Sequence, residues 1–158
     1  MKVRKVYLEE MIFILVREVE PIEAVKGTRI TREMGNGIGE AMMDSNAGRQ
    51  VIGNILDNAI KFSAPGSEIR VKTRLGAGDK VEVVIADDGP GFTQEDKERM
   101  FQKYSRLSAR PSAGEPSTGL GLFIVKSLVE EMGGRVRIED IEGVRGASFV
   151  IEFKKGKL

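Results

Sequence analysis

Apolar residues recur every three or four positions in three segments of the chain, and each segment predicts an amphipathic helix. The first helix is expected to end at Pro21 or soon after, because proline removes a backbone donor. Phe13 and Ile14 fall outside its apolar face. The second helix follows Asp44 or Ser45, either of which can cap it. The three predicted helices span about residues 8–21, 45–62 and 122–132.

Shorter runs with alternating or continuous apolar residues predict strands. The predicted strands are 28–34, 38–43, 68–74, 81–86, 135–140 and 147–153, and the first two flank a turn at 35–37. With the helices they predict an α/β (α+β) fold, a two-layer sandwich of about three helices on a mixed, mostly antiparallel sheet. Residues 87–121 have no sustained period, and in them only 94–104 could hold a short helix. A loop of this length is usually a functional lid or disordered.

The composition limits the chemistry. The 158 residues fit one domain, and the net charge of +1 gives no bulk attraction to nucleic acid or anionic membranes. The chain contains no cysteine and no histidine, which excludes disulfides, imidazole bases and cysteine- or histidine-based metal sites. No apolar run approaches the ~20 residues that span a bilayer. Catalysis would depend on carboxylates, amides, lysine, arginine, hydroxyls and backbone groups.

A polar ridge lies beside the apolar stripe of the second predicted helix. Asn54, Asn58 and Lys61 fall within about 60° of one another at 100° per residue. An amide oxygen suits Mg²⁺ and an ammonium group complements phosphate, so the ridge could hold a metal–phosphate group. A solvated helix edge explains the same residues about equally well.

Two glycine-containing segments could approach a ligand through their backbone. Asp87-Asp88-Gly89-Pro90-Gly91-Phe92 follows a buried strand and offers a carboxylate acceptor, suited to an exocyclic amine. Ser117-Thr118-Gly119-Leu120-Gly121-Leu122 opens the third helix, where free N–H groups suit phosphate. Taken alone, a tight turn and an ordinary helix start are the simpler interpretations.

The order and spacing of five segments resemble the catalytic, ATP-binding domain of sensor histidine kinases. They are N-I-L-D-N-A-I-K-F-S (54–63), D-D-G-P-G-F (87–92), M-F-Q-K-Y-S-R-L (100–107), T-G-L-G-L (118–122) and G-A-S-F (146–149). These look like the N, G1, F, G2 and terminal glycine boxes of that family. The resemblance implies the Bergerat ATP-binding fold over a single domain, 1–158, with an ATP lid at about 93–118.

The resemblance also implies a pocket for ATP or ADP with Mg²⁺. It assigns Asn58, with Asn54 beside it, to the metal, and Lys61 and Arg106 to the phosphates. Asp87 would accept a hydrogen bond from the adenine amino group. The other pocket residues that it implies are Phe62, Gly89, Gly91, Thr118, Gly119, Leu120, Gly121, Leu122 and Ser148. Ser117 and Gln102 depart from the family pattern, where a glycine and an acid are usual.

Asn54 bears on the reaction. Relatives that hydrolyse ATP resemble one another in carrying a glutamate at this position as general base, which an amide cannot replace. The resemblance therefore implies phosphoryl transfer, with Asn54, Lys61 and Arg106 as the catalytic set. Two alternatives stay open, a nucleotide-binding interaction module without transfer activity and a Bergerat-fold ATPase.

The family's phosphoacceptor is a histidine on a dimerising hairpin, and this sequence has no histidine. We therefore expect the isolated catalytic domain of a longer sensor kinase, inactive in autophosphorylation alone. Its expected partners are the histidine-bearing dimerisation domain and, indirectly, a response regulator. Nucleic-acid binding and direct membrane contact are not expected, and the expected location is the cytoplasm.

Overall fold

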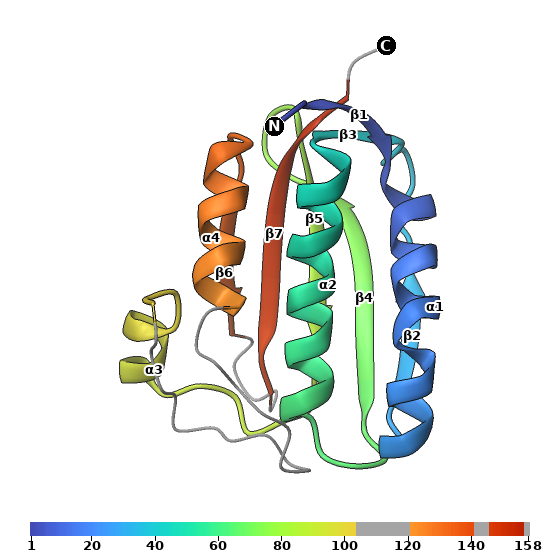
Figure 1. The fold of residues 1–158 in the computed structure, drawn as a ribbon, viewed down its shortest axis with the longest axis vertical. Coiled ribbons are helices and arrows are strands. Elements are labelled where there is room, and N and C mark those ends of the chain that lie inside the picture. Colours follow the sequence, from blue (N-terminus) through green and yellow to red (C-terminus); the bar gives the residue numbers. More distant parts are fainter. Residues whose placement is uncertain (104–120, 141–145, 157–158) are drawn as a thin grey trace.

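The computed structural model describes residues 1–103, 121–140 and 146–156, without the side chains of 22–26. Figure 1 shows α1, α2 and α4 on one face of a twisted sheet, with α2 in the middle, so the two predicted layers are confirmed. The elements are β1 (Arg4–Tyr7), α1 (Leu8–Lys26), β2 (Arg29–Glu33), β3 (Glu40–Met43), α2 (Ser45–Phe62), β4 (Glu68–Leu75), β5 (Lys80–Ala86), α3 (Gln94–Arg99), α4 (Gly121–Glu131), β6 (Arg135–Glu139) and β7 (Ser148–Lys155).

The sheet has the strand order β1-β3-β7-β5-β4-β2, and β6 adds to β7. Within the described residues, β2 and β4 run parallel and every other pair is antiparallel. The predicted mixed, mostly antiparallel sheet is therefore confirmed. β5 and β7 pair along seven residues at its centre, and this pairing sets where β5 ends.

The first two predicted strands, β2 and β3, flank a turn at residues 36–37 as predicted, but they do not pair with each other. β2 lies at one end of the sheet order, whereas β3 lies between β1 and β7. The connection between them is anchored to the body of the domain. Ile38 is buried in the core, and the N–H of Gly35 donates to the Thr73 hydroxyl at 2.9 Å. Thr73 belongs to β4, far along the chain, so local sequence does not reveal this contact.

Two further differences concern the first 26 residues. α1 continues to Lys26, five residues past Pro21. Pro21 is exposed, as is Arg17 one turn before it, so water can hydrate the carbonyl that the missing N–H leaves unpaired. β1 was not predicted, because its residues Arg4–Tyr7 are mostly exposed and it pairs only at the sheet edge.

α2 forms the centre of the helical layer. Its N-cap is Asp44, whose Oδ1 accepts a hydrogen bond from the Ala47 N–H at 2.9 Å, as the sequence predicts. One face of α2 is buried, and its buried residues are Ala47, Gly48, Val51, Ile52, Ile55, Leu56, Ala59 and Ile60. Their burial fixes the rotation of α2, and so determines which way its polar ridge faces.

A closed ring of four charges covers part of the opposite face of the sheet. Glu82 on β5 accepts hydrogen bonds from Arg74 at 2.7 Å and Arg137 at 2.9 Å, and Glu139 pairs with the same two arginines. The Glu82 side chain is only 8% exposed. Burial by itself would raise the pKa of Glu82, but the two arginine hydrogen bonds outweigh it and hold the pKa below its ordinary value.

We predict that this ring makes the fold acid-sensitive. The folded pKa of Glu82 is lowered, so its stabilisation is present above the unfolded pKa and is lost as the pH falls through the folded pKa. Glu82→Gln should lower the free energy of unfolding at neutral pH by about 1–3 kcal/mol and weaken its dependence on acid. Urea unfolding over a pH series measures both. Glu139→Gln, at the more exposed corner, is the control and should lose less.

Candidate functional site

The strongest candidate site lies where β5 ends, at Asp87. This residue is 5% exposed, and its Oδ1 accepts a hydrogen bond from the Gly89 N–H at 2.8 Å. Its own N–H donates to the Ala147 carbonyl at 2.9 Å, which continues the β5–β7 pairing past the last strand residue. Burial raises the pKa of the Asp87 carboxyl, although the Gly89 hydrogen bond opposes the shift. A buried carboxylate with one oxygen used inside the protein has acceptor capacity left for a ligand.

Glycines allow three chain segments to meet at Asp87 through their backbones. A Cβ at Gly146 would lie 1.8 Å from the Asp87 carbonyl oxygen, and the φ of Gly146 is +111°. A Cβ at Gly89 would lie 2.7 Å from the Phe62 carbonyl oxygen at the end of α2. Both distances are too short for any side chain. The glycines therefore allow three segments to approach through their backbones: the end of α2, the turn after β5 and the start of β7.

The predicted pocket residues Phe62, Gly91 and Ser148 are part of the same assembly. Ser148 is paired with Ala86 across β5 and β7, so it lies one residue from Asp87 at the same sheet end. Gly91 has a φ of +74°, and a Cβ there would lie 3.0 Å from the Gly146 carbonyl oxygen. The neighbouring Phe92 packs edge-on against Phe149 of β7, with ring centroids 5.9 Å apart. The structure therefore brings these residues together from three elements.

The polar ridge of α2 contains Asn54, Asn58 and Lys61, all half-buried. Within the described part of the chain, neither amide side chain makes a hydrogen bond, which leaves both amides available for a ligand. The Lys61 ammonium lies 3.0 Å from the Asp57 carboxylate one turn earlier. A phosphate group would have to compete with Asp57 for this cation.

Amide oxygens are the metal donors that the ridge offers. Among the described residues no three carboxylate, histidine or cysteine side chains cluster closely enough to hold a metal by themselves. A cation such as Mg²⁺ commonly keeps several waters and takes one or two protein ligands together with substrate phosphates. The donor set of Asn54 and Asn58 fits such a metal–phosphate complex and does not fit an all-protein metal site.

α4 begins at Gly121 and packs against α2, so its N-terminus lies at the same end of the molecule as the C-terminal end of α2 (Figure 1). The Leu122 side chain is buried in the core, so only its backbone could contact a ligand. A Cβ at Gly121 would have nothing within 4 Å among the described residues, so their packing does not require glycine there. Arg106, Thr118, Gly119 and Leu120 lie outside the described residues, as do Ser117 and most of the predicted lid.

Sequence reasoning missed two features of the site. Gly146 was part of a recognised box but was not selected as a site residue, and its contact with Asp87 depends on strand pairing that the sequence does not display. Arg70 on β4 lies 3.3 Å from Asp88, where it partly neutralises the carboxylate next to Asp87. A basic residue on a neighbouring strand carries no local signal of this role.

Comparisons with known proteins point to one family. The model of the family described as histidine kinase-, DNA gyrase B-, and HSP90-like ATPase matches residues 43–157. The sensor histidine kinase AruS of Pseudomonas aeruginosa (strain PAO1) is 37% identical over 110 residues, which are 67% of this chain and 11% of AruS. The chain spans about a tenth of the length of this relative, and also about a tenth of the Escherichia coli sensor protein EvgS, to which it is 35% identical over 113 residues.

Solved structures extend the likeness to the whole fold. The mycobacterial sensor histidine kinase MprB superposes with a TM-score of 0.84 at 26% identity, covering 98% of this chain and 100% of that chain. Full-length ShkA in complex with AMPPNP superposes with a TM-score of 0.84 at 25% identity, covering 100% of this chain and 32% of that chain. The seven-stranded α/β sandwich is therefore the fold of histidine kinase catalytic domains, as predicted. No helix in the described residues is both long enough and apolar enough to cross a membrane.

We predict that Gly146 tolerates no side chain. Gly146→Ala should lower the free energy of unfolding by about 1–3 kcal/mol through backbone strain, because the new Cβ would collide with the Asp87 carbonyl. Gly121→Ala is the matched control, because a Cβ there meets open space, and its unfolding midpoint should stay near that of the wild type. Chemical denaturation of both variants tests this, and equal stability would contradict the close approach.

Proposed function

The chain belongs to the family of histidine kinase-, DNA gyrase B- and HSP90-like ATPases, and from this premise we propose that it binds Mg-ATP and donates the γ-phosphoryl group to a histidine. The acceptor would lie on a separate dimerisation domain, and a response regulator would receive the phosphoryl group afterwards. The relative AruS is a sensor histidine kinase and the relative EvgS is a sensor protein, which supports a role in two-component signalling. The neighbour ShkA binds AMPPNP, which supports an adenine nucleotide as the ligand.

The buried carboxylate of Asp87 is the observation that carries the nucleotide proposal. It is fixed by the Gly89 N–H and lies beside glycines that leave no side chain over the backbone. Such a carboxylate can accept a hydrogen bond from the adenine amino group, with Ser148 nearby and Phe62 lining the base. Asp88 is paired with Arg70, so the second carboxylate of the turn is held in a separate ion pair.

The residues of α2 suit the phosphate end of the nucleotide. Asn58, with Asn54 one turn before it, would contribute amide oxygens to Mg²⁺, and Lys61 would contact phosphate oxygens after leaving Asp57. When bound, Mg²⁺ supplies positive charge that offsets the charge of the phosphates. Gly121 and Leu122 would offer backbone N–H groups at the start of α4. Arg106, Thr118, Gly119 and Leu120 complete the proposed set.

The proposed reaction is transfer instead of hydrolysis, because Asn54 cannot act as a base toward water. In this reaction an imidazole nitrogen of the partner attacks the γ-phosphorus, the bond to the β–γ bridging oxygen breaks, and ADP leaves. The domain would supply positioning and positive charge through Lys61 and Arg106. Because the chain has no histidine, it would not phosphorylate itself on histidine without a partner. The segment 93–118 is proposed as the lid of a single domain, 1–158, working in the cytoplasm.

The Asp87 proposal predicts a trade-off between binding and stability. Asp87→Asn should weaken ATP binding by about 1.5–3 kcal/mol, because the charge-assisted hydrogen bond is lost. The folded pKa of Asp87 is raised, so the wild type loses stability as the pH rises through it, and the neutral asparagine should make the nucleotide-free protein more stable at neutral pH.

Titration calorimetry and thermal unfolding measure the two effects on the same variant. Asp88→Asn is the control, because it makes the same chemical change at the neighbouring residue that pairs with Arg70. Its ATP affinity should remain within a few-fold of the wild type. Unchanged ATP affinity in Asp87→Asn would refute the adenine assignment.

The transfer proposal predicts a dependence on a partner. With ATP labelled on the γ-phosphate, the chain alone should release phosphate very slowly, and adding a histidine-bearing hairpin should place label on the hairpin. The control hairpin, with alanine in place of histidine, should stay unlabelled. Asn54→Glu should raise phosphate release, because it adds a base near the metal site. Rapid phosphate release by the wild type would indicate an ATPase, and ATP binding without label on the hairpin would indicate a binding module.

A further inference from the structure

The outer side of α1 carries two adjacent exposed apolar residues that the nucleotide site does not use. The side chains of Phe13 and Ile14 are 43% and 42% exposed. The opposite side of the helix is buried in the core through Leu8, Met11, Ile12, Leu15 and Val16. Figure 1 shows α1 at one side of the helical layer, with α2 as its neighbour, so its outer side is open to another molecule.

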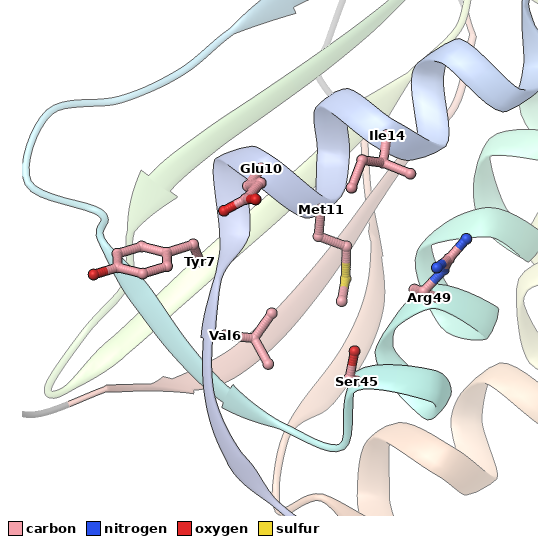
Figure 2. Close-up of a pocket in the computed structure, with 7 residues that line it drawn as sticks. All are labelled: Val6, Tyr7, Glu10, Met11, Ile14, Ser45 and Arg49. Carbon is pink, nitrogen blue, oxygen red and sulfur yellow. The ribbon is translucent and has the colours of Figure 1, made fainter.

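The apolar surface continues from Ile14 toward the start of the helix. Figure 2 shows Ile14 and Glu10 on the wall of a groove of about 150 Å³ that lies between α1, β1 and the first turn of α2. The residues lining it are Val6, Tyr7, Glu10, Met11, Ile14, Ser45 and Arg49. Ile14 is therefore one end of a larger partly apolar patch and not an isolated exposed side chain.

Two unpaired charges lie on the same helix surface. Within the described residues, neither Glu10 nor Arg17 takes part in an ion pair, whereas Glu18 beside them pairs with Arg49 at 2.6 Å. At 100° per residue, Glu10 and Arg17 point in directions about 20° apart, and Phe13 and Ile14 flank them at about 40–60° on either side. The exposed face of α1 thus carries a negative charge at Glu10, a positive charge at Arg17 and two apolar side chains between them.

This arrangement is complementary to itself when the helix is reversed. If a two-fold axis passes midway between residues 13 and 14, residue n of one copy lies level with residue 27 − n of the other copy. Glu10 then lies level with the partner copy's Arg17, at a distance of about 5 Å along the axis from the centre. At the centre, the Phe13 side chains of the two copies meet on one side of the helix pair, and the two Ile14 side chains meet on the other side. Antiparallel pairing therefore satisfies both charges and covers both apolar residues.

From this geometry we infer that α1 is a homodimer interface, in which two copies pair antiparallel through Glu10, Phe13, Ile14 and Arg17. The interface is isologous, as expected for a two-fold dimer. The Phe13 ring also lies 4.8 Å from the Arg32 guanidinium and 5.8 Å from that of Arg17, so these two cations already contact its ring. A single pair of helices buries less than the about 1,200 Å² of a standard interface, so association is weak and depends on concentration.

The strands at the two ends of the sheet order, β1 and β2, are poorer sites for a second copy. β1 at one edge is preceded by Lys2 and contains Arg4 and Lys5, so antiparallel self-pairing there would oppose like charges. β2 at the other edge has a burial pattern that is mostly exposed and carries Arg29, Arg32 and Glu33. The self-complementary charge pattern is found on α1 and not on these strands.

The test is sedimentation equilibrium of the whole chain from micromolar to millimolar concentration. The wild type should shift from its monomer mass of 17.4 kDa toward twice that value. Glu10→Arg and Arg17→Glu should each remain monomeric, because each places like charges level with each other. A 1:1 mixture of the two variants should recover the dimer, since every facing pair is then opposite in charge, and the double variant E10R/R17E should recover it alone.

Glu131→Arg is the matched control, because it makes the same charge change on the exposed end of α4, and it should dimerise like the wild type. Ile14→Asp should abolish the dimer while its thermal midpoint shows that the fold persists. A wild type that stays monomeric at millimolar concentration would overturn the inference, and so would a mixture of the two charge variants that fails to associate. ATP affinity is measured separately and should be equal in all of these variants.

Discussion

The close backbone contact between Gly146 and Asp87 is the constraint on which the candidate site depends. The Asp87 N–H extends the β5–β7 ladder by one hydrogen bond to Ala147, and the missing side chain at Gly146 lets the two backbones approach. Gly89 then sits against the Phe62 carbonyl at the end of α2. The central strand pair of the sheet therefore determines where the carboxylate lies relative to the helix that carries the two asparagines.

Burial of the Asp87 carboxylate works against folding and in favour of ligand binding. The same loss of water that raises the pKa of Asp87 also strengthens any hydrogen bond that a ligand donates to it. The protein limits the cost through the Gly89 N–H and through Arg70, which offsets the charge of Asp88. By contrast, Glu82 is nearly as buried but has two arginine partners, so its pKa moves the other way and its role is stability. The two buried acids thus have different roles: Glu82 in β5 stabilises the fold, and Asp87 in the following turn is proposed to bind a ligand.

Local sequence patterns were sufficient to predict where most helices and strands lie, but not which strands lie next to each other in the sheet. The periodicity of α2 and its Asp44 cap fixed its bounds, because both signals lie within a few residues of each other. The strands β2 and β3 were found, but their separation depends on distant contacts at Thr73 and Ile38. Asp87, Gly89 and Ser148 were selected as candidate site residues through an ordered set of boxes, whereas the contacts of Gly146 and Arg70 depend on strand pairing that no short segment encodes.

α2 connects the two regions to which functions are proposed. Its first turns lie beside α1, where Arg49 pairs with Glu18, and its last turns carry Asn58 and Lys61 toward the sheet end at Asp87. In Figure 1, α1 and α4 lie on opposite sides of α2. A partner on the outer side of α1 therefore approaches from the side away from α4, and the proposed nucleotide-binding end remains open. Pairing of two copies through α1 would therefore leave the proposed nucleotide site accessible, and α2 is the element that contacts both α1 and α4.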